Sequence, residues 1–394
     1  MGDFYFNPWD SDFRDNPYPY YASLNAEPPR ILDLFGPAAL VARHCDVVAA
    51  LKDHERFSSV RPSHYSALSP FGAIQTMLTS DPPDHSRLRR LISRDFTPRR
   101  VEGLKPRIQA ITSQLLDRMA GRGAFDAIAD LADVLPVMVI AELLGVPAEL
   151  HEKFKTWSDA IVAGGNTPPT SPRPESFNKA REALHSYFVA QIERRRAEPG
   201  TDLISALVAA HDDNDALTAD EMVAFIMLLL LAGNETTTNL IGNGTRLLAQ
   251  QPGAAERLRR SPDLIPNAIE EILRYDPPVQ AVIRFALTDA EIGGVLIPSG
   301  AKVFELLAAA NRDPAVFKEP ERFDIARTPN DHVSFGDGIH FCLGASLARL
   351  EGAIAIGATL KRFARIRLAE PGVKPVYKGS FFLRGLASLT IAVE

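Results

Sequence analysis

The sequence predicts a mainly α-helical fold with small β-sheets, and two observations support this. First, a helical pattern begins at Thr218 and contains no proline before Pro252. It opens with the capping-box spacing Thr218-x-x-Glu221, and about 30 residues rising about 1.5 Å each span roughly 50 Å, enough to cross a domain. Second, beyond Tyr275 the apolar residues alternate as in β-strands. No long polar linker divides the chain, so we expect one domain over residues 1–394.

The other elements follow from the same patterns, in chain order. Residues 1–60 are rich in turn residues and contain one candidate strand, Ala38–Val41, and Pro62–Pro83 and Gly164–Pro174 are typical of loops. Apolar residues at helical spacing predict further helices over Asp84–Phe96, Arg99–Met119, Leu131–Leu144, Phe177–Arg195, Pro266–Tyr275 and Leu343–Phe363. Alternation predicts strands within Val279–Leu287, Glu291–Val303 (a hairpin around Gly293-Gly294) and Tyr377–Val393.

Composition excludes several classes of protein. The 43 basic residues against 49 acidic ones give a net charge of −6, so no basic field indicates a nucleic-acid partner. Two cysteines, Cys45 and Cys342, are too few for a disulfide framework or a multi-cysteine zinc site. The longest uncharged apolar run, Met222–Gly233, is shorter than the ~20 residues that span a membrane. The acidic N-terminus does not resemble a signal peptide. We therefore expect a soluble cytoplasmic protein without a membrane anchor.

The surroundings of Cys342 favour a role in chemistry. Glycines at 336, 338 and 344 allow tight turns and a close approach of the backbone to a flat group. The helix expected from Leu343 would direct N–H groups at the sulfur and favour the thiolate. A single thiolate in such a loop suits an axial metal ligand, and haem iron accepts one. Taken alone, however, a lone cysteine in a glycine-rich turn is more commonly a free buried thiol.

The long helix becomes polar at its centre, in Ala232-Gly-Asn-Glu235-Thr236-Thr237. Buried polar groups without partners cost about 1–3 kcal/mol each, so this change needs a cause. Gly233 lacks a side chain where something could lie close, and a threonine hydroxyl can bond the carbonyl four residues earlier and distort the helix. The plain alternative is that the helix emerges into solvent here. The apolar flanks, Leu228–Leu231 before and Leu240-Ile241 after, argue against that alternative.

Two further pairs are weak signals by themselves. Glu271 and Arg274, at i and i+3, can pair on one helix face. His85 and Arg89, four residues apart, project from one face and could hold an anion together. Each spacing is also common on ordinary solvated helices.

These residues carry a family resemblance. Phe335–Gly344 resembles the haem-binding signature of the cytochrome P450 superfamily, Phe-x-x-Gly-x-His-x-Cys-x-Gly, at every fixed position. The resemblance extends over nearly the whole chain. It implies the cytochrome P450 fold, with the long central helix crossing over a haem b, and it makes Cys342 the thiolate ligand of the iron. Phe335, Gly336 and Gly344 would then shape the loop around the cofactor.

The resemblance also assigns roles to the other motifs. Ala232-Gly233-x-Glu235-Thr236 resembles the oxygen-activation motif, in which Glu235 relays protons and Thr236 steadies the dioxygen. The haem propionates would contact four cationic side chains: His85, Arg89, Arg284 and His340. Glu271 and Arg274, with the downstream segments Asn311-Arg-Asp-Pro and Pro320-Glu-Arg322-Phe, resemble the family's structural network, which implies a Glu271–Arg274–Arg322 cluster beneath the cofactor.

By family position, the substrate pocket would be walled by apolar side chains. The candidates are Phe71, Ile74, Met77, Leu229, Val279, Val282, Phe381 and Phe382. Each of them, taken singly, also fits ordinary core or loop packing. Because the candidate lining shares no charged residue, we expect a bulky neutral substrate, such as a steroid, terpenoid, macrolide or fatty acid.

The implied activity is that of a bacterial-type monooxygenase, which inserts one oxygen atom of dioxygen into a C–H bond. Electrons would come from NAD(P)H through a separate reductase and a ferredoxin or flavodoxin, and we expect a monomer. A basic group, Arg90, Arg94, Arg99 and Arg100, would contribute to docking of that carrier, although ordinary helix surface also explains such an excess. Two alternatives remain: a peroxide-driven relative, against which Glu235-Thr236 argues, and a non-enzymatic haem sensor or electron carrier.

Overall fold

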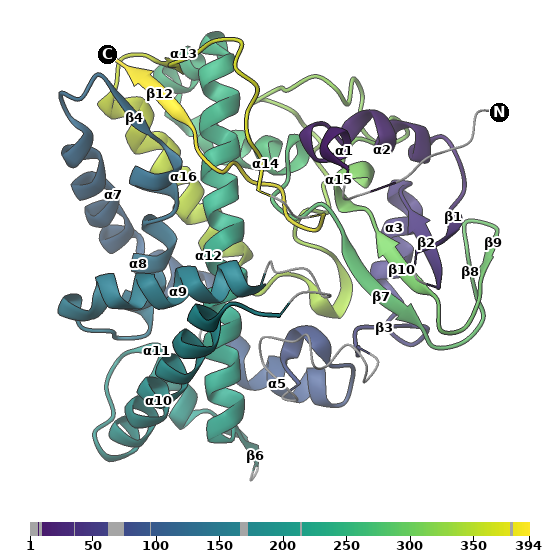
Figure 1. Cartoon of the computed structure of the whole chain (residues 1–394), viewed down its shortest axis with the longest axis horizontal. Coiled ribbons are helices and arrows are strands. Elements are labelled where there is room, and N and C mark those ends of the chain that lie inside the picture. Colours follow the sequence, from purple (N-terminus) through teal and green to yellow (C-terminus); the bar gives the residue numbers. More distant parts are fainter. Residues whose placement is uncertain are drawn as a thin grey trace.

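We describe the protein from a computed structural model of the chain (Figure 1). The structure describes residues 7, 10–34, 36–61, 75–94, 96–165, 172–212, 215–378 and 381–394. Two predicted pocket residues, Phe71 and Ile74, lie outside these ranges.

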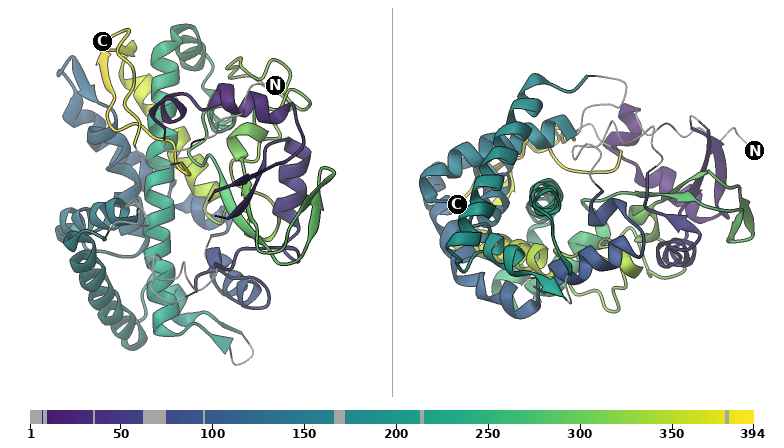
Figure 2. Two further views of the ribbon diagram at one scale, coloured as in Figure 1. Left: turned by 45° about the vertical axis from the view of Figure 1, so that its right-hand side comes forward. Right: turned by 90° about the horizontal axis from the view of Figure 1, so that it is seen from below.

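The predicted long helix is confirmed as α12, Ala219–Gln250, a helix of 32 residues. Thr218 caps its N-terminus, because the hydroxyl accepts from the Glu221 N–H while the Glu221 side chain accepts from the Thr218 N–H. The helix crosses the molecule from end to end (Figures 1 and 2). Among the residues that the structure describes, α12 is the one helix apolar and long enough to span a membrane, and 72% of that apolar window is buried inside the fold.

Helices surround α12. They pack on it as α8 (Leu135–Leu143), α9 (His151–Gly165), α10 (Glu175–Ala197), α13 (Pro252–Arg260), α14 (Ile265–Tyr275) and α16 (Ala345–Arg362). Two more lie near its first half, α5 (Asp84–Ser93) and α11 (Leu203–Ala209). Leucine, isoleucine and phenylalanine side chains from α8 to α12 form one buried cluster, and those from α7, α8, α12, α14 and α16 form another. The core therefore lies along both halves of the central helix.

Several predicted helix boundaries are wrong. The single helix predicted over Arg99–Met119 is divided into α6, Pro98–Gly103, and α7, Lys105–Met119. Pro106 explains the break, because it has no N–H to continue the first helix but is well suited to the start of the next. The helix predicted from Leu131 begins only at Leu135, after a short π-helical turn, Ile128–Ala132. Gly145, with φ +67°, ends α8 as predicted.

Other helices were missed by the sequence analysis. The N-terminal part, predicted to be turns and one strand, also contains α1 (Ser11–Asp15), α2 (Tyr18–Asn25) and α3 (His44–Lys52). The short α15, Leu307–Ala310, packs against α2 and α3. These helices span only four to nine residues, so their apolar periodicity is weak.

The strand-rich part is a five-stranded sheet beside the helices. Its strands, in spatial order, are β1 (Arg30–Asp33), β2 (Pro37–Val41), β10 (Lys302–Glu305), β7 (Val282–Ala286) and β3 (Phe57–Ser58). Only the β2–β10 pair within this sheet is parallel. The predicted hairpin is confirmed: β8 (Ala290–Ile292) and β9 (Val295–Ile297) pair across Gly293 and Gly294, whose φ values are +57° and +84°.

The C-terminal prediction holds only in part. β12, Thr390–Val393, pairs with β11 (Ile366–Leu368) and β4 (Ala124–Asp126). Between Tyr377 and Thr390 the described backbone forms two isolated bridges instead of strands, Tyr377 with Leu386 and Val279 with Leu383. Two small remaining strands, β5 (His211–Asp212) and β6 (Asp215–Ala216), pair before α12.

Candidate active site

A stripe of α12 is open at the centre of the core helix. Ala232 is exposed and Leu229, Gly233 and Thr236 are partly exposed, at the spacing of one helix face. The neighbours on the other faces, Asn234, Glu235, Thr237 and Thr238, are buried. The helix therefore does not emerge into solvent over a whole turn, as the plain alternative requires; one face of it borders an open space.

The polar residues of this segment have specific partners. The Thr236 hydroxyl donates to the Ala232 carbonyl at 2.6 Å, which is the i−4 bond expected from the sequence. Asn234 donates from Nδ2 to the Ser158 hydroxyl on α9 at 3.1 Å, and Thr238 donates to the Ala132 carbonyl at 2.9 Å. Glu235 is only 5% exposed. A carboxyl and a hydroxyl therefore lie at adjacent positions, with the hydroxyl on the open face.

At Gly233 the structure shows one close neighbour, on α8. A Cβ at Gly233 would lie 3.2 Å from Cδ1 of Ile140 on α8. The glycine therefore allows α8 to pack closely on α12, which fixes the position of the open stripe.

The loop before α16 carries Cys342 and is shaped by two glycines. Gly336 and Gly338 have φ values of +71° and +67°, a region that favours glycine. A Cβ at Gly338 would lie 2.7 Å from the Leu51 carbonyl oxygen at the end of α3. The Cys342 N–H donates to the Phe335 carbonyl at 2.9 Å and closes the loop. Gly344 was expected to turn the backbone too, but its φ of −84° is open to any residue.

The charge state of the Cys342 thiol differs from the expectation. Burial raises the pKa of Cys342, and the Gly344 N–H and the positive charges of Arg89 and Arg349 lower it without reversing that rise. The thiolate is thus favoured by its neighbours but disfavoured by desolvation, and a metal ion would have to displace the proton. In the described part of the chain, no three His, Cys, Asp or Glu side chains are grouped to hold a metal ion.

Four predicted anion-binding residues come from three elements. His85 and Arg89 lie on α5, Arg284 on β7, and His340 two residues before Cys342. The rings of His85 and His340 are 4.3 Å apart between centroids. Burial and then the Arg284 charge lower the pKa of His340 to about 3, and burial followed by the Arg89 charge lowers the pKa of His85. Both imidazoles are therefore neutral near pH 7.

These groups are set up to receive an anion. Both ring nitrogens of His85 are buried without a hydrogen-bond partner among the described residues. His340 Nε2 is 2.9 Å from the Ser59 hydroxyl, and the backbone N–H of Ser59 donates to the Asp81 carboxylate. Burial lowers the pKa of Arg89, so its charge is poorly solvated. An anion would accept from the one N–H of the neutral His85 ring and compensate the excess positive charge.

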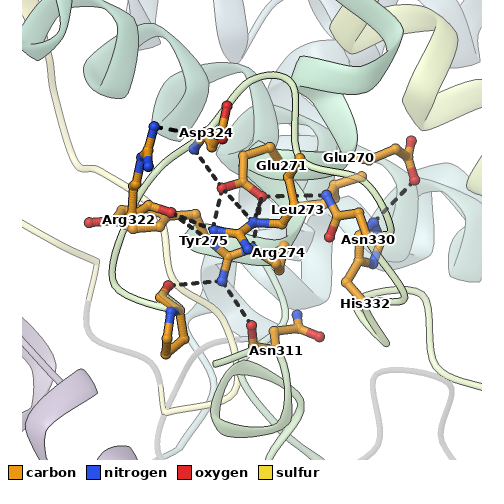
Figure 3. A network of polar contacts seen from close by, with 12 residues as sticks. Glu270, Glu271, Leu273, Arg274, Tyr275, Asn311, Arg322, Asp324, Asn330 and His332 are labelled. Carbon is orange, nitrogen blue, oxygen red and sulfur yellow. Dashed lines mark hydrogen bonds and ion pairs between the residues drawn. The ribbon is translucent and has the colours of Figure 1, made fainter. Parts of the chain in front are cut away.

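Glu271 and Arg274 form a buried ion pair on α14 (Figure 3). Arg274 Nε lies 2.7 Å from Glu271 Oε2 and Nη2 lies 2.9 Å from Oε1. Arg274 also donates to the backbone carbonyls of Asn311, Pro320 and Arg322 at 2.9–3.1 Å. The helix is thereby tied to the segment that leads to the Cys342 loop.

The prediction that the Arg322 side chain completes this network is wrong. The Arg322 side chain is 62% exposed and pairs with Glu319; only its carbonyl takes part. The second guanidinium belongs to Arg327, whose Nε is 3.1 Å from Glu271 Oε2. The backbone around Arg322 directs its carbonyl oxygens toward the guanidinium groups of Arg274 and Arg327, so the Arg322 side chain points to solvent.

A second ion pair near Cys342 was missed by the sequence analysis. Arg349 on α16 donates to both oxygens of Glu270 on α14 at 2.8 Å, and its guanidinium lies 4.5 Å from the centroid of the Phe335 ring. Burial alone would raise the pKa of Glu270, but hydrogen bonds from His332 and Arg349 lower it to about 2. The spacing Cys342 to Arg349, two helical turns, was the available signal. This pair holds the cysteine loop against α14.

The predicted pocket residues come from separate elements. Met77 and Leu229 are partly buried beside the α8–α12 cluster, and Val279 and Val282 beside the sheet. Phe381 and Phe382 have ring centroids 5.0 Å apart, and both contact Phe304, at 5.8 and 6.2 Å. Phe382 is 39% exposed.

Two surface predictions can also be placed. The side chains of Arg90, Arg94, Arg99 and Arg100 are exposed on or beside α5 and α6. Phe341, next to Cys342, is 41% exposed. Cys45 is an exposed free thiol on α3.

These residues fit the haem implied by the sequence resemblance. An open helix face, a partly buried cysteine in a glycine-shaped loop and a cluster of cationic and unpaired groups match a flat ligand that takes one thiolate and carries two carboxylates. Cys342 would be the iron ligand, and His85, Arg89, Arg284 and His340 would hold the carboxylates.

Comparisons with known proteins agree with this geometry. The family model described as Cytochrome P450 matches residues 14–386. A vitamin D(3) 25-hydroxylase of Pseudonocardia autotrophica is 44% identical over 97% of this chain and 94% of its own. A 6-deoxyerythronolide B hydroxylase of Saccharopolyspora erythraea is 44% identical over 81% of this chain and 78% of its own.

Solved structures show the same relationship. The cytochrome P450 PksS of the Bacillus subtilis bacillaene polyketide synthase superimposes with a TM-score of 0.91 at 38% identity, covering 99% of this chain and 100% of that one. Fold, cysteine loop and relatives agree. This chain therefore belongs to the cytochrome P450 family and is a haem-thiolate monooxygenase.

Proposed function

We propose that this enzyme hydroxylates a bulky, neutral, lipid-like molecule, with a steroid, terpenoid, macrolide or fatty acid as the substrate class. The observation that carries the proposal is the open stripe of α12, where Leu229, Ala232 and Thr236 face the same space. Phe381 and Phe382 add aromatic surface, and an apolar site with few polar groups suits such a ligand. The named substrates of two relatives, vitamin D3 and 6-deoxyerythronolide B, belong to the same class.

The reaction must balance electrons and protons. Substrate, dioxygen, two electrons and two protons give the alcohol and water. The haem, taken here as haem b, supplies the redox chemistry when it is bound. The chain would supply the Cys342 thiolate to hold the iron, Glu235 and Thr236 to handle protons, and two arginines and two histidines to hold the propionates.

Each protein group has a physical task. The acidic Glu235 lies buried one residue before Thr236, and a buried carboxyl can hold and release a proton while bulk water is excluded. The Thr236 hydroxyl lies on the open face and can receive a hydrogen bond there. Arg89 and Arg284 supply permanent positive charge for two carboxylates, and the neutral His85 and His340 supply neutral N–H donors.

We further propose that residues 1–394 form one monomeric, cytoplasmic haem domain that receives electrons from separate proteins. A ferredoxin or flavodoxin with its NAD(P)H reductase would dock at the exposed arginines, Arg90, Arg94, Arg99 and Arg100. Phe341 is exposed and directly precedes Cys342, the proposed iron ligand, in the chain. It would therefore border this surface.

Two measurements test the proposal. Reduced protein treated with carbon monoxide should show the thiolate-type Soret shift, and its absence would contradict the Cys342 assignment. Titration with steroids, terpenoids, macrolides and fatty acids should then displace haem-bound water for one class. Turnover supported by peroxide but not by dioxygen and reductant would instead indicate the peroxygenase alternative, and binding of no organic ligand would indicate the sensor.

A further inference from the structure

Glu305 on β10 is a buried carboxyl that the reaction described above does not use. Its side chain has 0% exposure, and neither oxygen has a hydrogen-bond partner among the residues that the structure describes. An unpaired buried carboxylate is strongly disfavoured. This side chain therefore needs either a proton or a compensating charge.

The register of the sheet identifies the nearest compensating charge. Glu305 lies opposite Val282, and Val303 lies opposite Arg284, in the antiparallel β10–β7 pair. Opposite residues, and residues two apart on one strand, share a face of the sheet. Glu305 is thus the diagonal neighbour of Arg284, at about 7–8 Å between the backbones, within reach of two long side chains.

Arg284 interacts electrostatically with Glu305 and also with the histidines of the cofactor site. Its Nη1 donates to its neighbouring Ile283 carbonyl at 3.0 Å, and its charge also lowers the pKa of His85 and His340 on the cofactor side. Burial raises the pKa of Glu305 to about 7, against the opposing influence of Arg284. The one guanidinium therefore interacts both with the Glu305 carboxyl and with the histidines of the anion site.

The other elements packed on β10 provide no competing free charge in the described structure. The opposite residue on β2 is Val41, and α15 consists of Leu307 and three alanines. Three titratable or charged side chains of α3 have partners elsewhere: His44 contacts the Asp331 carbonyl, Asp46 pairs with Arg43, and Lys52 pairs with Asp337. The fourth, Cys45, is exposed and contacts Asp46.

We propose that Glu305 is a positioning residue for the cofactor. Glu305 competes with the haem carboxylates for Arg284, and it takes up a proton when the negative charge at the haem increases. The inference rests on the proposed contact between Arg284 and a haem propionate. When Arg284 is engaged by the propionate, Glu305 loses its counter-charge and favours the protonated form. Reduction of the haem adds one more negative charge and favours protonation of Glu305 further.

The test is the pH dependence of the haem reduction potential in the holoprotein. The midpoint potential of the wild type should fall as the pH rises from 6 to 9, because reduction is coupled to proton uptake. Complete coupling would shift the reduction equilibrium tenfold per pH unit, about 59 mV for a one-electron couple. The pKa of His340 is lowered to about 3, far below this range, and burial lowers the pKa of His85 as well.

Variants assign the coupling to the residue. Glu305→Gln should remove most of the pH slope, and Glu305→Leu should do the same if the glutamine variant does not fold. Glu351→Gln is the matched control, because Glu351 on α16 is equally buried and its pKa is raised to about 8 by burial. A wild type without a slope would overturn the inference, as would a slope that survives in Glu305→Gln or disappears in Glu351→Gln.

The outcome is separable from that of the proposed function. A holoprotein with the thiolate-type carbon monoxide spectrum, but with an unchanged slope in Glu305→Gln, refutes only the role of Glu305. Protein that gives no such spectrum refutes the haem assignment itself.

Discussion

Arg274 and Glu271 form a bidentate ion pair in which neither side chain is exposed to solvent, with N–O distances of 2.7 and 2.9 Å. Removing one member of such a pair leaves the other charge buried. We expect Arg274→Ala to lower the free energy of unfolding by about 3–5 kcal/mol. Chemical denaturation of the purified protein measures this loss, and the yield of haem-loaded protein should fall with it.

The position of the second arginine gives a sharper comparison. Arg327→Ala removes a guanidinium that bonds Glu271, so it should cost about 1–3 kcal/mol. Arg322→Ala removes an exposed side chain and should change stability by less than about 0.5 kcal/mol. Equal losses in the two variants would contradict the network as the structure shows it.

Thr236 is expected to matter for coupling of electrons to product. Thr236→Ala removes the hydroxyl on the open face of α12, so more reductant should end in peroxide and less in product. Thr245→Ala is the control, because the Thr245 hydroxyl makes the same i−4 bond, to Ile241 at 2.8 Å, at a buried position further along the helix. Peroxide and product yields per NAD(P)H decide the matter: equal coupling in Thr236→Ala and the wild type contradicts the relay.

The two cysteines should differ in their effect on the carbon monoxide spectrum. Cys342→Ser should abolish the thiolate-type Soret shift of the reduced carbon monoxide complex, because a serine hydroxyl is not a thiolate ligand. Cys45→Ser should leave that spectrum unchanged, since Cys45 is an exposed thiol on α3. Retention of the shift in Cys342→Ser would exclude Cys342 as the ligand.

The Glu270–Arg349 pair predicts an acid limit to stability. The pKa of Glu270 is lowered from 4.5 to about 2 in the folded protein. Its contribution is therefore complete above about pH 4.5 and is lost as the pH falls toward 2. Because Glu270 is partly exposed, we expect no more than about 2 kcal/mol. Glu270→Gln should lower stability at pH 6 and reduce its fall between pH 4.5 and 3; a variant with the wild-type acid profile would contradict this.

Charge reversal tests the docking surface. Arg99→Glu with Arg100→Glu should slow reduction by an acidic electron carrier about tenfold at low ionic strength, with a smaller effect in high salt. Arg365→Glu with Arg367→Glu is the control; these side chains, 78% and 66% exposed, lie at β11 and pair with the C-terminal residue Glu394. Stopped-flow reduction rates that respond equally to both changes would place the docking surface elsewhere.

Much of this molecule could be predicted from local sequence patterns. Features that depend on contacts between residues far apart in the chain could not. The capping box at Thr218 and the unbroken apolar run located α12, and the spacing around Cys342 located the loop, because both signals lie within a few residues. The choice of Arg327 over Arg322 depends on how residues 311–327 fold around Arg274, which no spacing encodes. The boundary at Pro106 was visible in the sequence but was outweighed by the helical period on both sides.

The hydrogen bond from Thr236 to the Ala232 carbonyl uses the donor of the Thr236 hydroxyl and leaves its acceptor lone pairs. Its proton is committed to the helix, so toward the open space the oxygen presents only lone pairs. A molecule that approaches Thr236 must therefore bring the hydrogen itself. The site thus favours an oxygen that carries a hydrogen over an oxygen that carries none, before any acid transfers a proton. The hydrogen bond to the α12 backbone causes this preference.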